Sequence, residues 1–84
     1  TLTRQEAAVM LGRVFTKLGG TIPAVSSTSF ADDGNVAGWA KSEVAFMSGK
    51  GIVKGVGDNK FAPTRTLSIQ EAVIMANRML ETLK

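Results

Sequence analysis

Apolar residues recur at helical spacing in three segments of the 84-residue chain. Residues 4–18 and 69–83 each place apolar side chains three and four positions apart, which is typical of an amphipathic helix. A shorter pattern covers residues 37–48. We expect these helices to bury, in turn, Ala7, Met10, Leu11, Val14 and Leu18; Trp39, Ala40, Val44 and Met47; and Ala72, Met75, Ala76, Met79 and Leu83. The pattern predicts an all-α fold of three helices joined by long ordered loops.

Glycine, proline and serine separate the predicted helices. Gly19 and Gly20 end the first helix, and a Pro-, Ser- and Thr-rich connector without periodicity follows it. Gly49 and Gly51 end the second helix. Residues 51–66, called here the glycine-rich loop, carry apolar side chains that we expect to fix an irregular segment on the core, namely Ile52, Val53, Val56 and Phe61.

The two long helical segments begin as copies of each other. Residues 1–15 align with 66–80 at a constant offset of 65, with seven identities in fifteen positions. Both copies contain the capping-box pattern, in which a hydroxyl accepts the amide three residues on and a glutamate accepts the first amide in return. Each box contributes on the order of 1 kcal/mol. This structural role accounts for Thr3, Glu6, Ser68 and Glu71.

One position of the repeat changes character, because Arg4 in the first copy corresponds to Ile69 in the second. Arg4 falls at the first helical position, where the helix dipole disfavours a cation by some tenths of a kcal/mol. A guanidinium beside unpaired helix-start amides is also a good receptor for a carboxylate or phosphate. The sequence therefore leaves two interpretations of Arg4: a solvated arginine paired with an acid, or an anion-binding residue.

The composition of the chain argues against several kinds of functional site and partner. The chain has no cysteine and no histidine, which excludes disulfides, thiolate nucleophiles and the usual zinc or copper ligands. The net charge of +3 is spread without a run of like charges, so we expect no nucleic-acid partner. No apolar stretch approaches the ~20 residues that span a bilayer. The turn residues Asp32, Asp33 and Asn35 lack the ligand order of an EF-hand, and we expect them to cap and shape the start of the second helix.

No catalytic constellation is evident either, so we expect no enzyme activity, no metal and no cofactor. The chain starts at Thr1 without an initiator methionine or a signal-peptide pattern, and we expect it to be a piece of a longer protein.

Five short motifs in register resemble a surface-layer homology (SLH) module. In order they are Phe30-Ala-Asp32, Trp39-Ala40, Gly51-Ile-Val-x-Gly55, Phe61-x-Pro63 and the Ser68-x-x-Glu71 helix start. The resemblance divides the chain into 1–18, the closing helix of a preceding repeat; 19–29, a connector; and 30–84, one SLH repeat. The segment "TRQE" at Thr3–Glu6 is similar to the Thr-Arg-Ala-Glu motif of the family.

The resemblance implies non-covalent anchoring of a secreted bacterial protein, at the S-layer or wall of a Gram-positive cell. In such modules the basic residue of the motif contacts a negatively charged, often pyruvylated, secondary cell-wall polysaccharide, and neighbouring SLH repeats pack around a central helical bundle. By this resemblance the ligand-binding residues are Arg4, Gln5, Trp39, Asp58 and Lys60. Trp39 also has a simpler interpretation, favoured here, as a core residue of the second helix.

The chain departs from the family pattern at two points, and the first of them favours an alternative function. Ile69 stands where a second cation is expected, and Asp58-Asn59 replaces the usual Asp-Gly. The alternative is a structural or protein–protein interaction module that has lost carbohydrate binding. The isolated fragment is expected to self-associate through copies of Met10, Val14, Met75 and Met79, unless the connector covers them with Ile22, Pro23 and Val25.

Overall fold

The computed structural model describes residues 2–83 and is helical throughout its regular elements. Helix α1 spans Arg4–Lys17, α2 spans Lys41–Gly49 and α3 spans Ile69–Thr82, while two short 3₁₀ turns, η1 (Asp33–Asn35) and η2 (Gly38–Ala40), precede α2. Over residues 2–83 there is no strand, only the isolated bridges Thr3–Thr66 and Gly57–Lys60. The predicted all-α class is therefore confirmed. The long helices were predicted to within a residue at each end.

Both long helices start at the capping boxes read from the sequence. The Thr3 hydroxyl accepts the amide of Glu6 at 3.3 Å, and the Glu6 carboxylate accepts the Thr3 amide at 2.9 Å. Ser68 and Glu71 repeat the arrangement at 3.1 and 3.2 Å. These reciprocal bonds satisfy amide donors that a helix start otherwise leaves unpaired, which fixes where each helix begins.

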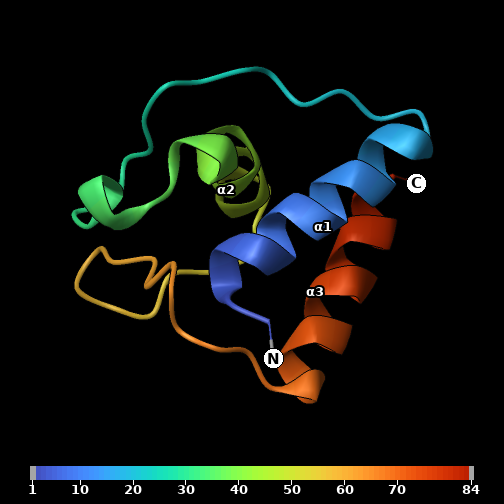
Figure 1. The fold of residues 1–84 in the computed structure, drawn as a ribbon. Helices are drawn as coiled ribbons and strands as arrows, with labels where there is room; N and C mark the ends of the chain where they lie inside the picture. The colour runs from blue at the N-terminus through green and yellow to red at the C-terminus, as the bar shows by residue number, and fades with distance from the viewer. Residues whose placement is uncertain (1, 84) are drawn as a thin grey trace.

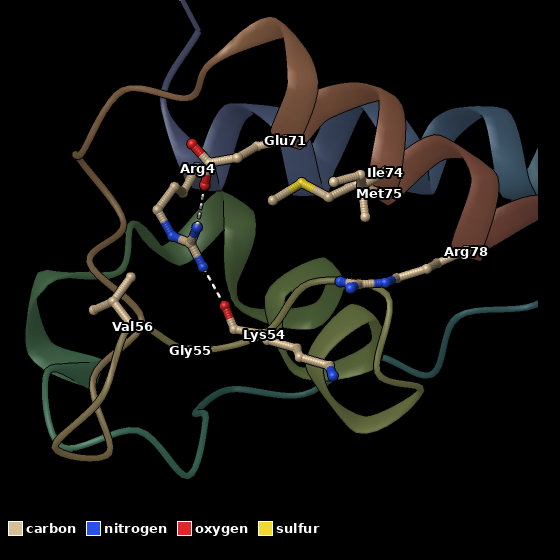
Figure 2. A pocket seen from close by; sticks show the side chains of 8 residues that line it. All are labelled: Arg4, Lys54, Gly55, Val56, Glu71, Ile74, Met75 and Arg78. Atoms are coloured by element: carbon tan, nitrogen blue, oxygen red, sulfur yellow. Dashed lines mark hydrogen bonds and ion pairs between the residues drawn. The ribbon is translucent and has the colours of Figure 1, made fainter.

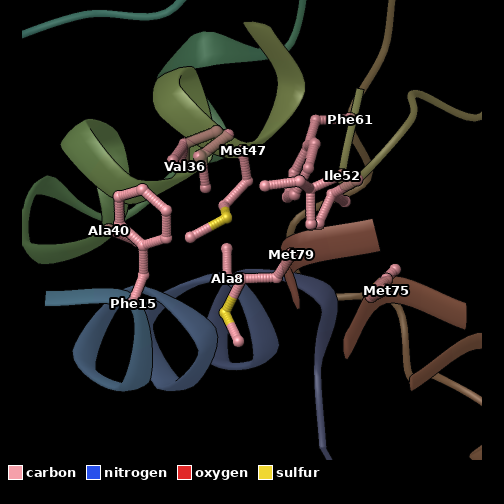
Figure 3. Packing of buried hydrophobic residues seen from close by; sticks show 11 residues of the cluster. Ala8, Phe15, Val36, Ala40, Met47, Ile52, Phe61, Met75 and Met79 are labelled. Atoms are coloured by element: carbon pink, nitrogen blue, oxygen red, sulfur yellow. The ribbon is translucent and has the colours of Figure 1, made fainter. Parts of the chain in front are cut away.

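Helix α1 lies between the other two helices, with α2 against one side and α3 against another (Figure 1). The helices α1 and α3 run side by side in the same general direction. Side chains from all three helices and from the glycine-rich loop meet in one core (Figure 3). Its buried members are Ala8, Phe15, Val36, Ala40, Val44, Met47, Ile52, Val53, Phe61, Met75 and Met79.

The two repeat copies bury different faces. In α3, Met75 and Met79 are buried as expected, but their counterparts in α1, Met10 and Val14, are about half exposed. Helix α1 instead buries the face of Ala8 and Phe15. The prediction for α1 was wrong, for Leu18 as well as for Met10 and Val14, because this helix has two apolar faces and packs mainly against α2 and the glycine-rich loop.

Trp39 is not a core residue: it is 60% exposed. The prediction placed it inside a helix starting at residue 37, but α2 begins at Lys41 and Trp39 belongs to the 3₁₀ turn η2. The change from a 3₁₀ turn to an α-helix breaks the periodicity that linked Trp39 to Ala40, Val44 and Met47. Those three residues are buried as expected.

The connector crosses from α1 to α2 without regular structure (Figure 1). The Val25 amide donates to the Ser42 hydroxyl at 2.9 Å, which ties the connector to α2. Ile22 packs over Gly12, where an added Cβ would lie 3.1 Å from the Ile22 Cδ1 atom and 2.7 Å from the Glu43 Cγ atom. Pro23 and Val25 are exposed, so they do not cover Met10 and Val14.

Candidate functional site

The Arg4 guanidinium is buried and bonded to the chain itself. Its Nε atom donates to the Phe61 carbonyl at 2.8 Å, and Nη2 donates to the Lys54 carbonyl. The guanidinium also lies 5.0 Å from the centre of the Phe61 ring, within cation–π range. Arg4 as a whole is 4% exposed. One residue of α1 thus holds two points of the glycine-rich loop.

The first amides of α1 are also occupied. The Arg4 amide donates to the Arg65 carbonyl at 2.9 Å, and the Gln5 amide donates to the Pro63 carbonyl at 3.0 Å. The expectation that unpaired amides at this helix start would help to bind an anion was therefore wrong. The end of the glycine-rich loop occupies that position.

A groove opens beside Arg4, between the glycine-rich loop and the outer side of α3 (Figure 2). Its volume is about 250 Å³. We call it the Arg4–Arg78 groove; it is lined by Arg4, Lys54, Gly55, Val56, Glu71, Ile74, Met75 and Arg78. Three basic side chains and one carboxylate therefore share this surface.

The carboxylate of the groove is held by its own helix start and by Arg4. Glu71 Oε1 accepts the Ser68 amide, and Oε2 lies 3.7 Å from Arg4 Nη1. The hydrogen bond from the Ser68 amide is the main cause of the lowered pKa of Glu71, and the charge of Arg4 makes a smaller contribution. Burial lowers the pKa of Arg4, and Glu71 partly opposes that change. Glu71 therefore offsets the charge of Arg4, while Lys54 and Arg78 keep the groove positive.

Asp32 fixes the conformation of the glycine-rich loop at Phe61 and Ala62. Its two carboxylate oxygens accept the amides of Phe61 at 2.9 Å and Ala62 at 2.8 Å. Ala62 has φ of +56°, a left-handed conformation that a residue with a Cβ rarely adopts, so these bonds hold a strained turn. Burial raises the pKa of Asp32, but the bonds from the Phe61 and Ala62 amides, together with its own amide and the charge of Lys60, outweigh burial and lower the pKa.

Asp33 forms a second polar cluster. Its carboxylate accepts the Thr28 amide and hydroxyl and the ammonium of Lys41 at 2.9 Å. The bond from Lys41 and those from Thr28 lower the pKa of Asp33 to about 2. Neither Asp32 nor Asp33 caps α2. They tie the glycine-rich loop and the connector to the turn before that helix, so the expected capping role was wrong.

The structure does not bring the other predicted ligand residues into the Arg4–Arg78 groove. The Gln5 side chain is buried and its Oε1 accepts the Ala37 amide at 2.9 Å. Trp39 lies on a different surface, beside Met10 and Arg13. Asp58 and Lys60 are exposed in the turn of the glycine-rich loop. The groove is bordered by residues 54–56 of that loop, earlier in the chain than expected.

Sequence reasoning missed two basic residues of the groove, Lys54 and Arg78. The repeat contains a partial signal for Arg78, because the 65-residue offset aligns it with Arg13 and marks it as part of a copied helix surface. No local pattern connects Lys54 with α3, and their proximity depends on how the loop folds over the core.

Residues 2–83 contain neither a metal-binding cluster nor a membrane-spanning helix. No group of three or more acidic, histidine or cysteine side chains within this range could hold a metal ion. The helices of the same range are all too short or too polar to cross a bilayer.

Comparison with known proteins agrees with the motif order. The S-layer homology domain family matches residues 29–73, more than half of the chain. The chain is 32% identical over 82 residues to "Exoglucanase XynX" of Acetivibrio thermocellus and 30% identical over 82 residues to "Amylopullulanase" of Thermoanaerobacterium thermosulfurigenes. Each alignment covers 96% of this chain but only 8% and 4%, respectively, of those much longer proteins. No solved structure matches the chain significantly. The chain belongs to the S-layer homology domain family.

Proposed function

We propose that this chain anchors a surface protein to the bacterial cell wall by binding an anionic, pyruvylated secondary polysaccharide. S-layer homology modules are non-catalytic anchoring modules of cell-surface proteins. The observation that carries the finer proposal is the Arg4–Arg78 groove, in which three basic side chains face one carboxylate that is already bonded. Such a surface attracts a carboxylate-bearing sugar and repels a cationic one.

The proposed chemistry is recognition without bond cleavage. A guanidinium and an ammonium bind a carboxylate by charge-assisted hydrogen bonds, which are about twice as strong as neutral ones. Val56 and Ile74 add exposed apolar surface beside the charges. A pyruvyl ketal carries a carboxylate and a methyl group on one carbon, so it complements a groove that is both basic and apolar.

The proposed function also assigns a role to each of three segments of the chain. Residues 1–18 close a preceding repeat, 19–29 connect, and 30–84 form one repeat that packs beside neighbouring SLH repeats. The two curated relatives are named as enzymes, and this chain spans a small share of each. We propose that the chain is the wall-attachment part of a longer extracellular protein of a Gram-positive cell, located in the wall or its S-layer.

One observation favours a second candidate, a structural or protein–protein interaction module. The Arg4 guanidinium bonds to the chain's own carbonyl groups, and its repeat counterpart Ile69 carries no charge. If the basic motif residue serves only the fold, then the module links repeats and does not bind sugar.

Sedimentation with purified cell walls separates the two candidates. The anchoring proposal expects the chain to pellet with intact walls, to stay in solution with walls stripped of secondary polysaccharide, and to be released by free polysaccharide. Equal pelleting with both wall preparations, or none with either, would support the interaction module instead.

A further inference from the structure

Arg78 is an arginine whose guanidinium has no partner among the residues that the structure describes. It projects from α3 into the Arg4–Arg78 groove, on the same side as the Lys54 ammonium (Figure 2). The residue is half-buried, yet its guanidinium makes no hydrogen bond or ion pair within residues 2–83. A guanidinium has five N–H donors in a planar fork that matches a carboxylate. All five are available on Arg78.

Arg4, in contrast, is buried and already bonded to the chain. Two of its donor groups bond to backbone carbonyls of the glycine-rich loop, and Nη1 faces Glu71. Its 4% exposure leaves little surface for a ligand. Moving Arg4 onto a ligand would leave the Lys54 and Phe61 carbonyls without their donor, at a desolvation cost that a sugar contact must first overcome.

We propose that Arg78, assisted by Lys54, makes the direct contact with the carboxylate of the bound sugar, and that Arg4 is a positioning residue for the loop that carries Lys54. This inference rests on the proposed function and states which residues of the same groove recognise the ligand. The ligand class is a sugar with a carboxylate ketal: the carboxylate pairs with Arg78, and the methyl group packs on Ile74, one turn earlier on α3, and on Val56 of the loop.

The repeat supplies a matched control. Arg13 occupies the position of Arg78 in the first copy, has the same side chain and is exposed, but it lies outside the groove, beside Trp39. Arg13→Ala and Arg78→Ala therefore remove the same charge from equivalent helical positions. A general electrostatic attraction predicts equal effects of the two changes, whereas a direct contact predicts an effect of Arg78→Ala alone.

The test is a calorimetric titration of the full chain with the methyl glycoside of a pyruvyl-ketal hexosamine, compared with the same glycoside lacking the ketal. For the ketal ligand we expect Arg78→Ala to raise Kd roughly ten- to a hundredfold, which corresponds to a lost charge-assisted hydrogen bond, and Arg13→Ala to leave it within about twofold. Arg78→Lys should fall between, because it keeps the charge and loses the fork. The midpoint of thermal unfolding should change little in Arg78→Ala, since no hydrogen bond or ion pair among residues 2–83 is removed.

Two different failures can be told apart. If the ketal glycoside binds the wild-type chain and Arg78→Ala binds it as tightly as Arg13→Ala does, the assignment of Arg78 is wrong and the anchoring function stands. If neither the ketal glycoside nor intact wall polysaccharide binds the wild-type chain, the proposed function fails and the assignment fails with it.

Discussion

Arg4 and Ile69 occupy the same position in two copies of one helix start, but Arg4 is 4% exposed and Ile69 is 85% exposed. The glycine-rich loop covers the Arg4 face of α1 and turns the carbonyls of Lys54 and Phe61 towards it. A cation there satisfies those acceptors. Within residues 2–83 no segment covers the equivalent face of α3, so nothing in that range requires a cation at Ile69.

The first prediction compares these two positions. Arg4→Met should lower the free energy of unfolding by about 2–4 kcal/mol, because two carbonyls of the loop lose a charged donor. Ile69→Ala should change it by less than about 0.5 kcal/mol, as expected for a surface side chain. Urea unfolding followed by circular dichroism measures both. Equal effects would show that Arg4 does not hold the loop.

Acid should remove the stabilising contribution of Asp33. Its pKa is lowered from 3.8 to about 2 by Lys41 and Thr28, so the carboxylate is charged in the folded state at pH values where the unfolded chain binds a proton. A lowered folded-state pKa stabilises the fold above the unfolded-state value and ceases to do so as the pH falls through the folded-state value. Most of the loss therefore falls between pH 3.8 and about 2.

The measurement for Asp33 is the difference in unfolding free energy between wild type and Asp33→Asn. This difference should be largest at neutral pH and shrink towards zero near pH 2. Asp58→Asn is the control, because Asp58 lies in the exposed turn of the glycine-rich loop. A difference that does not depend on pH would contradict the assignment of this stability to the ionised Asp33 carboxylate and its bonds to Lys41 and Thr28.

Asp32 should control the local stability of the glycine-rich loop. Asp32→Ala removes both acceptors of the Phe61 and Ala62 amides and leaves the positive φ of Ala62 unsupported. We expect these two amides to exchange with solvent at least about tenfold faster, since one lost bond to a charged group is worth roughly 1.5–3 kcal/mol. Hydrogen exchange followed by NMR reports each amide. Unchanged protection of both would mean that other contacts set this turn.

The isolated chain should self-associate through Met10 and Val14 of α1, and not through Met75 and Met79, which were expected to take part as well. Met75 and Met79 are buried within the chain, whereas Met10 and Val14 remain exposed. Apolar surface left in water costs ~25 cal/mol per Å², which favours a contact between two copies. We expect dimers at micromolar concentration in sedimentation velocity, and monomers for Met10→Lys. Val25→Lys, at another exposed apolar site, in the connector, is the control. A monomeric wild type would overturn this prediction.

The sequence predicted the helix positions well because the determinants are local. Capping boxes at Thr3 and Ser68 fix two helix starts within four residues each, independent of tertiary contacts. The buried face of α1 could not be predicted in the same way. Met10 and Val14 form as good an apolar stripe as Ala8 and Phe15, and only the position of α2 and the glycine-rich loop decides between them.

The candidate site was harder to predict, for a related reason. The sequence identified Arg4 as unusual but did not reveal its acceptors, which lie 50 and 57 residues further along the chain. Lys54 and Arg78 also come from separate segments of the chain and line one groove. Loop conformation held by Asp32 brings them together, and no periodic pattern encodes that conformation.

The most direct test of the account is to map where an acidic wall oligosaccharide binds. Titration of the isotope-labelled chain with a pyruvylated wall fragment, followed by backbone NMR, should shift the amides of residues 54–56 and 71–78 and the side-chain signal of Arg78. The fragment without its pyruvyl groups should shift them far less. Shifts centred on Trp39 or on the 57–60 turn, or no saturable shifts at all, would contradict the claim that the Arg4–Arg78 groove is the anchoring site.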